Sequence, residues 1–205
     1  MIRILFAILL FLHGFIHAMG FAIAFGYLHN AAFTKTVSKF SGIAWLLVLV
    51  LFIIAAIAFI TRKDYWPVIA LIAVVISQVL IFMVWKDAKF GTIANLIICF
   101  VAIIGWANIR LDQKVRQQVK IMLPVTLPKP KLIDLQMIAG LPLPVQKWLQ
   151  VSGVVGTNTA HTIRLKQLGR MCTKPGGKWM DFSADQYVNT EQASFIWHAK
   201  VDMMP

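Results

Sequence analysis

The sequence predicts a membrane protein of the all-α class, with a four-helix transmembrane bundle followed by an antiparallel β-rich α+β domain. Apolar residues make up 59% of the 205 residues, whereas soluble domains contain about 45–50%. Charged residues are sparse in the first half, and a two-residue periodicity appears only near the C-terminus. We therefore expect a transmembrane region over residues 1–110, an amphipathic helix with a proline-containing linker over 111–131, and a soluble domain over 132–205.

Four segments are apolar enough and long enough to cross a bilayer, which takes about 20 helical residues. They cover residues 4–28, 42–60, 66–85 and 91–109, and none of them contains Lys, Arg, Asp or Glu. The apolar run of the first segment is longer than the core of a signal peptide, which has about 7–15 residues. We therefore expect the first segment to remain in the mature chain as a span.

The positions of Lys and Arg around these segments predict the orientation, because cytoplasmic loops carry an excess of both residues. The side of the N-terminus carries Arg3, Arg62, Lys63, Arg110, Lys114, Arg116 and Lys120, and the other side carries Lys35, Lys39, Lys86 and Lys89. We therefore expect both termini in the cytoplasm. The formal charge of +12 fits cytoplasmic flanks that attract anionic lipid headgroups, and no nucleic-acid partner is expected.

The first span contains two histidines, His13 and His17, which share one helix face because they are four residues apart. A polar side chain inside a membrane is costly and normally faces the interior of the bundle. The same span carries small residues at a spacing of four, which allows helices to approach closely. These small residues are Gly14, Ala18, Ala22 and Gly26. The first span is therefore expected at the packed centre of the bundle.

Two interpretations of the histidine pair stay open. Neutral imidazole is the commonest metal ligand, so the pair could serve a haem or a metal ion. Alternatively, each imidazole forms a hydrogen bond to a neighbouring span. Ser77, Gln78 and Asn95 offer partners, and at about 1.5 Å per residue Gln78 and His17 reach similar depths. No other span contains a histidine. We therefore expect a contact between a histidine and an amide, with no metal site and no cofactor.

The clearest strand pattern covers residues 193–203, where large apolar side chains alternate with polar ones. Phe195 and Trp197 fall on the apolar side, which we expect to be the inner face of a curved antiparallel sheet. About 50 residues of β-structure are too few to close a core. We therefore expect that the domain continues beyond Pro205, or that its strands pair with another chain.

Several stretches of the chain together resemble one family of proteins. They are HGFIHAMGF in the first span, WKDAKFGTIANLII around the start of the fourth, and LPLPVQKWLQVSGVVG, GRM and KWMDFSADQYVN near the C-terminus. The chain is similar to a family of uncharacterised bacterial multi-pass membrane proteins with a C-terminal soluble domain of unknown function. The resemblance implies a bacterial inner-membrane location and a longer C-terminal domain, but it implies no activity and no catalytic residue.

Two functional hypotheses follow. In the first, the protein is a membrane-anchored module that binds an apolar or lipid-like ligand through Phe195 and Trp197. In the second, it is a membrane redox or transport protein that uses His13 and His17. Soluble enzyme chemistry has little support, because the polar residues of the C-terminal region show no spacing typical of a nucleophile and its base. The oligomeric state is left open.

Overall fold

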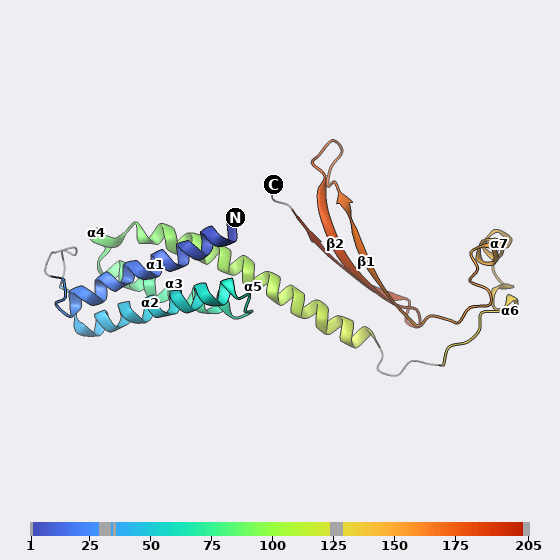
Figure 1. Cartoon of the computed structure of the whole chain (residues 1–205), viewed down its shortest axis with the longest axis horizontal. Coiled ribbons are helices and arrows are strands. Elements are labelled where there is room, and N and C mark those ends of the chain that lie inside the picture. Colours follow the sequence, from blue (N-terminus) through green and yellow to red (C-terminus); the bar gives the residue numbers. More distant parts are fainter. Residues whose placement is uncertain (1, 29–33, 35, 124–128, 203–205) are drawn as a thin grey trace. The chain divides into compact units, whose positions relative to one another are not determined.

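A computed structural model describes residues 2–28, 34, 36–123 and 129–202. The chain divides into two compact units, Met1–Leu111 and Asp112–Pro205. Part of the predicted linker, residues 124–128, lies outside the described residues. Figure 1 shows helices in the first unit and a sheet in the second.

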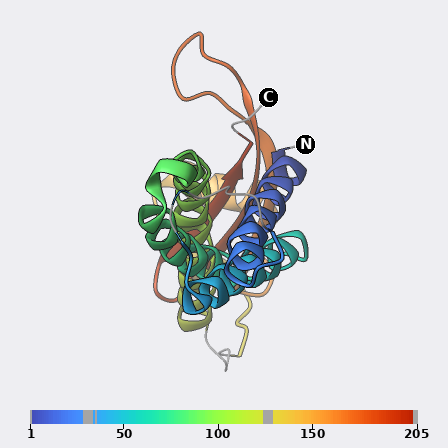
Figure 2. The same cartoon turned by 90° about the vertical axis from the view of Figure 1, so that its left-hand side faces the viewer.

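The first unit is built from helices, four of which are long enough and apolar enough to cross a membrane among the described residues. The helices are α1 (Ile2–Ala24), α2 (Lys39–Ile60), α3 (Trp66–Met83), the short α4 (Trp85–Ala88) and α5 (Gly91–Met122). In Figure 2, which views them nearly end-on, α1 and α2 lie side by side. The prediction of four apolar helices followed by an antiparallel sheet is therefore confirmed.

Helix α1 ends at Ala24, four residues earlier than the expected span, because a Schellman motif stops it. Gly26 has φ of +76°, a left-handed conformation that glycine adopts without a steric penalty. The N–H of Tyr27 donates to the carbonyl of Ala22, and the N–H of Gly26 donates to that of Ile23. These two hydrogen bonds are the pair that defines the motif.

The other helix bounds also differ from the expected ones. Helix α3 ends at Met83, two residues before the expected end of the third span, and Val84 separates it from the short α4. Helix α5 is continuous over 32 residues, so the expected amphipathic helix is the C-terminal part of α5. The boundary between the two units falls within α5, after Leu111.

Two glycines of α1 lie in tight contact with α2, Gly14 of the predicted small-residue pattern and Gly20 outside it. A Cβ atom added to Gly14 would lie 2.8 Å from Cβ of Phe52, and one added to Gly20 would lie 2.2 Å from the Trp45 ring. Gly26 differs from the prediction, because it ends the helix and no heavy atom of the described residues lies within 4 Å of the same position. The close approach therefore comes from Gly14 and Gly20, and it brings α1 against α2.

The second unit begins with two short helices, α6 (Leu135–Ile138) and α7 (Leu143–Val151). A three-stranded antiparallel sheet follows, in the order β1 (Thr162–Met171), β2 (Met180–Asn189) and β3 (Ser194–Val201). Gln167 pairs with Ala184, and Ala184 pairs with Ala199. This register gathers the apolar positions of the three strands on one face and the charged positions on the other.

The charged face of the sheet contacts the C-terminal part of α5. Asn189 Nδ2 donates to the carbonyl of Met122 at 2.7 Å, and Asp112 accepts from Lys200 Nζ at 3.2 Å and lies 3.3 Å from His198 Nε2. The apolar face is left exposed, with Phe195 66% and Trp197 43% accessible. The expectation that these two side chains occupy an inner face is therefore wrong, because α5 contacts the opposite face.

Candidate functional site

His13 and His17 lie one turn apart on α1, and both are buried, with exposed fractions of 4% and 1%. Their rings lie against aromatic neighbours from α2. The centroid of Phe52 is 5.1 Å from that of His13, and the centroid of Trp45 is 5.1 Å from that of His17. The close packing at Gly14 and Gly20 brings these neighbours to α1. The two imidazoles therefore sit in a narrow space that leaves their rings little freedom.

A closed circuit of hydrogen bonds joins both histidines to α3 and α5. His17 Nδ1 lies 2.8 Å from the carbonyl oxygen of His13, which only accepts, so this nitrogen carries the hydrogen. His17 Nε2 then accepts from Ser77 Oγ at 2.9 Å. Asn95 Nδ2 donates to Ser77 Oγ at 3.0 Å, and Asn95 Oδ1 accepts from His13 Nε2 at 2.8 Å. These contacts therefore assign a donor or acceptor role to both ring nitrogens of His17 and to Nε2 of His13.

Two further side chains extend this circuit. Asn95 Nδ2 also donates to Gln78 Oε1 at 3.0 Å, and Gln78 Nε2 donates to Thr92 Oγ1 at 3.1 Å. The predicted contact between a histidine and an amide is present, but His13 and Asn95 form it, and Gln78 contacts the amide of Asn95 instead. Thr92 was not anticipated as a partner, although its position one turn before Asn95 places the two on one helix face.

The donor set of this circuit fits a structural role better than metal or haem ligation. The Nε2 atoms of both histidines are engaged by Asn95 and Ser77, so a metal ion would have to break the hydrogen bonds that join three helices. Within the described ranges, no group of three or more His, Cys, Asp or Glu side chains could hold a metal ion. What remains free is one lone pair, on His13 Nδ1, to which no described residue donates.

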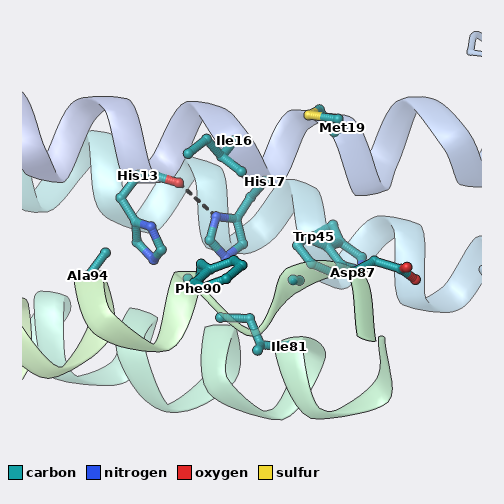
Figure 3. A pocket seen from close by; sticks show the side chains of 11 residues that line it. His13, Ile16, His17, Met19, Trp45, Ile81, Asp87, Phe90 and Ala94 are labelled. Atoms are coloured by element: carbon teal, nitrogen blue, oxygen red, sulfur yellow. Dashed lines mark hydrogen bonds between the residues drawn. The ribbon is translucent and has the colours of Figure 1, made fainter. Parts of the chain in front are cut away.

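A cavity of about 380 Å³ adjoins the histidines. Figure 3 shows side chains from α1 on one side of it and side chains from α4 and α5 on the other. Its walls are mostly apolar, and its polar lining residues are His13, His17, Trp45 and Asp87. This combination of an apolar cavity with few polar groups is typical of small-molecule sites.

Phe195 and Trp197, the other predicted binding residues, belong to the second unit and form a separate candidate site on the apolar face of the sheet. The Trp197 indole N–H donates to Gln167 Oε1 at 2.6 Å, and its ring lies edge-on to Phe182 at 6.1 Å between centroids. Strand β1, at the other edge of the sheet from β3, adds Ile163 and Leu165, which are also exposed. The site is therefore a broad apolar surface on which Trp197, Gln167 and Gln186 are joined by hydrogen bonds.

The structure also pairs charged residues that look scattered in the sequence. His161 Nδ1 lies 2.6 Å from Glu191 Oε1, and the Arg164 guanidinium donates to Asp185 at 2.9 Å. The hydrogen bond from Arg164 to Asp185 raises the pKa of the guanidinium above its ordinary value. Pairing across antiparallel strands depends on the register, which alternation alone does not determine. Sequence reasoning therefore missed these contacts.

Comparison with known proteins adds a family match for the second unit. Residues 131–205 match the model of a family of unknown function (DUF6544). Searches of curated proteins and of solved structures found no match to the chain. The residues that form the sheet and its apolar face are thus similar to an uncharacterised domain.

Proposed function

We propose that the protein is a membrane-anchored module whose C-terminal sheet binds an apolar or lipid-like ligand. The observation that carries this proposal is the exposed apolar face of the sheet, opposite the face that contacts α5. Contiguous apolar surface of this kind marks an interaction site on most proteins. The ligand would lie across β1, β2 and β3 and contact Phe195 and Trp197.

A cross-linking experiment tests ligand binding with the full chain. A photoreactive fatty acid should label the wild-type sheet, and Phe195→Ser should reduce this labelling severalfold. Leu168→Ser is the matched control, because Leu168 lies on the opposite face and is 87% exposed. Equal labelling of the two variants would overturn the proposal.

The membrane part of the proposal has its own support. Four helices have the length and apolarity of spans, and the Lys and Arg distribution favours cytoplasmic termini. We propose that the protein is a multi-pass protein of a bacterial inner membrane with this orientation. In a background without Cys99 and Cys172, an impermeant thiol reagent should label Lys89→Cys in intact cells and spare Lys63→Cys. The reverse pattern would overturn the orientation.

A second candidate function is redox or transport chemistry at the histidine pair. The observation that favours it is the cavity that reaches both imidazoles. The hydrogen bonds that already engage Nε2 of His13 and Nε2 of His17 argue against this function. A Soret absorbance band or stoichiometric metal in the purified full chain would favour this second function over ligand binding at the sheet.

A further inference from the structure

One of the imidazole nitrogens beside the cavity has no hydrogen-bond partner among the described residues. His13 Nε2 donates to Asn95, and in the neutral tautomer with this hydrogen the second ring nitrogen, Nδ1, is a lone pair. No described residue donates to this atom. His13 is 4% exposed, yet Nδ1 is not among the buried side-chain polar atoms that lack a partner, which in the described residues are His161 Nε2 and Ser194 Oγ. His13 Nδ1 therefore retains access to space, and the cavity that His13 lines is next to it.

Gly91 keeps space open beside the same ring. A Cβ atom at this position would lie 3.7 Å from His13 Cε1 and 2.9 Å from Cδ1 of Ile81. Cε1 is the carbon between the two ring nitrogens, so this edge of the imidazole faces a wall that has no side chain. The remaining wall consists of apolar groups such as Ile16 and Ala94, which Figure 3 shows around the histidines.

Two other polar groups of the cavity, the imidazole of His17 and the carboxylate of Asp87, offer no free donor. His17 uses its N–H on the carbonyl of His13 and its lone pair on Ser77. The Asp87 carboxylate accepts from the N–H and the hydroxyl of Thr34 through Oδ2. A carboxylate is acceptor-only when ionised. The cavity can therefore accept a hydrogen bond from a ligand at His13, while its apolar walls accommodate the rest of the molecule.

From the unused acceptor at His13 and the apolar walls, we infer that the cavity is a binding site for an apolar molecule that carries a hydroxyl group. This hydroxyl group donates a hydrogen bond to His13 Nδ1. A hydroxyl donor satisfies the buried lone pair, whereas an ether or ester of the same shape leaves it unpaired. An anionic head is disfavoured, because the cavity already holds the Asp87 carboxylate and burial of an unpaired charge costs more than burial of a hydroxyl. The cavity volume of about 380 Å³ falls within the range of small-molecule pockets.

Two probes of nearly equal shape test the inference, 4-phenylbutanol and its methyl ether. Their binding to the full chain in lipid nanodiscs can be measured by equilibrium dialysis, with empty nanodiscs to subtract partitioning. We expect the alcohol to bind roughly three- to tenfold more tightly than the ether, as one net hydrogen bond allows. In a chain labelled with ¹⁵N-histidine, the alcohol should shift the Nδ1 resonance of His13 and the ether should not.

Three variants locate the site. Ala94→Phe fills the cavity and should abolish binding of both probes. Ala107→Phe is its matched control on the same helix, because Ala107 is exposed and does not line the cavity. His13→Phe should remove the preference for the alcohol. Should that variant fail to fold, the alcohol–ether ratio of the wild type and the two alanine variants still decide.

Each other outcome overturns the inference. Equal binding of alcohol and ether would show a non-specific apolar pocket only, and equal binding by the two alanine variants would place the probes elsewhere. Neither outcome bears on the sheet, so failure of this site is distinguishable from failure of the proposed function.

Discussion

The two units distribute polar and apolar groups in opposite ways. In the helical unit, His13, His17 and Asn95 are buried and linked to one another, while many large apolar side chains cover the outside. In the sheet unit, the ion pairs of the strands lie on the face that contacts α5, and Phe195 and Trp197 are exposed on the other face. An apolar exterior has no cost in hydrocarbon, whereas an exposed apolar face in water favours a partner. The first unit therefore turns its polar groups inward, whereas the sheet of the second unit exposes an apolar face.

The largest expected effect breaks the close packing of the helical unit. Gly20→Leu would place a side chain where even a Cβ atom would lie 2.2 Å from the ring of Trp45, which is buried. We expect a loss of at least about 3 kcal/mol, the upper range for overpacking, and little folded protein. Thermal unfolding in detergent measures it. Phe15→Leu, on the exposed side of the same helix, is the control and should unfold like the wild type.

The next effect concerns the hydrogen-bond circuit. Asn95→Leu removes hydrogen bonds to His13, Ser77 and Gln78. At about 0.6 kcal/mol for each intramembrane hydrogen bond, we expect a loss of about 2 kcal/mol. A double-mutant cycle with His13→Leu should show a coupling energy, because the two residues bond directly. Additive losses would contradict the circuit.

A smaller effect separates packing from ligation at His17. His17→Gln keeps a donor and an acceptor and should lose less stability than His17→Leu, which gives up about 1 kcal/mol for two hydrogen bonds. A haem or metal site predicts another order, since glutamine does not replace an imidazole ligand. Stability and bound cofactor, measured together for both variants, distinguish the two orders.

The smallest effect lies on the charged face of the sheet. Asp185→Asn removes the ion pair with Arg164. The side chain of Arg164 is 53% exposed and that of Asp185 is 41% exposed. Exposed ion pairs contribute little, so the unfolding midpoint should stay within error. The hydrogen bond to Asp185 raises the pKa of Arg164, so its contribution to stability is present below the unfolded pKa and is lost only as pH rises through the folded pKa, far above neutral pH. The variant should therefore match the wild type across neutral pH, and a clear shift of the midpoint would contradict this assignment.

The amino-acid sequence by itself determined the local structure and the inventory of polar groups. Apolar runs without charges specify the four long helices, because burial of a charge in them would be costly. Alternation specifies the strands, because successive side chains point to opposite faces. The sequence also located His13, His17, Ser77, Gln78 and Asn95 within apolar segments, and polar groups in such segments must find partners.

Only the tertiary structure decided which of these groups meet and which sheet face is covered. The rotation of α1 depends on the fit of Gly14 and Gly20 against α2, and this fit directs His13 to Asn95 and His17 to Ser77. The exposed face of the sheet depends on Asp112 and Met122, which contact the charged face from another element. Periodicity defines a face within one element, but its neighbour is set by packing between elements that are distant in the chain.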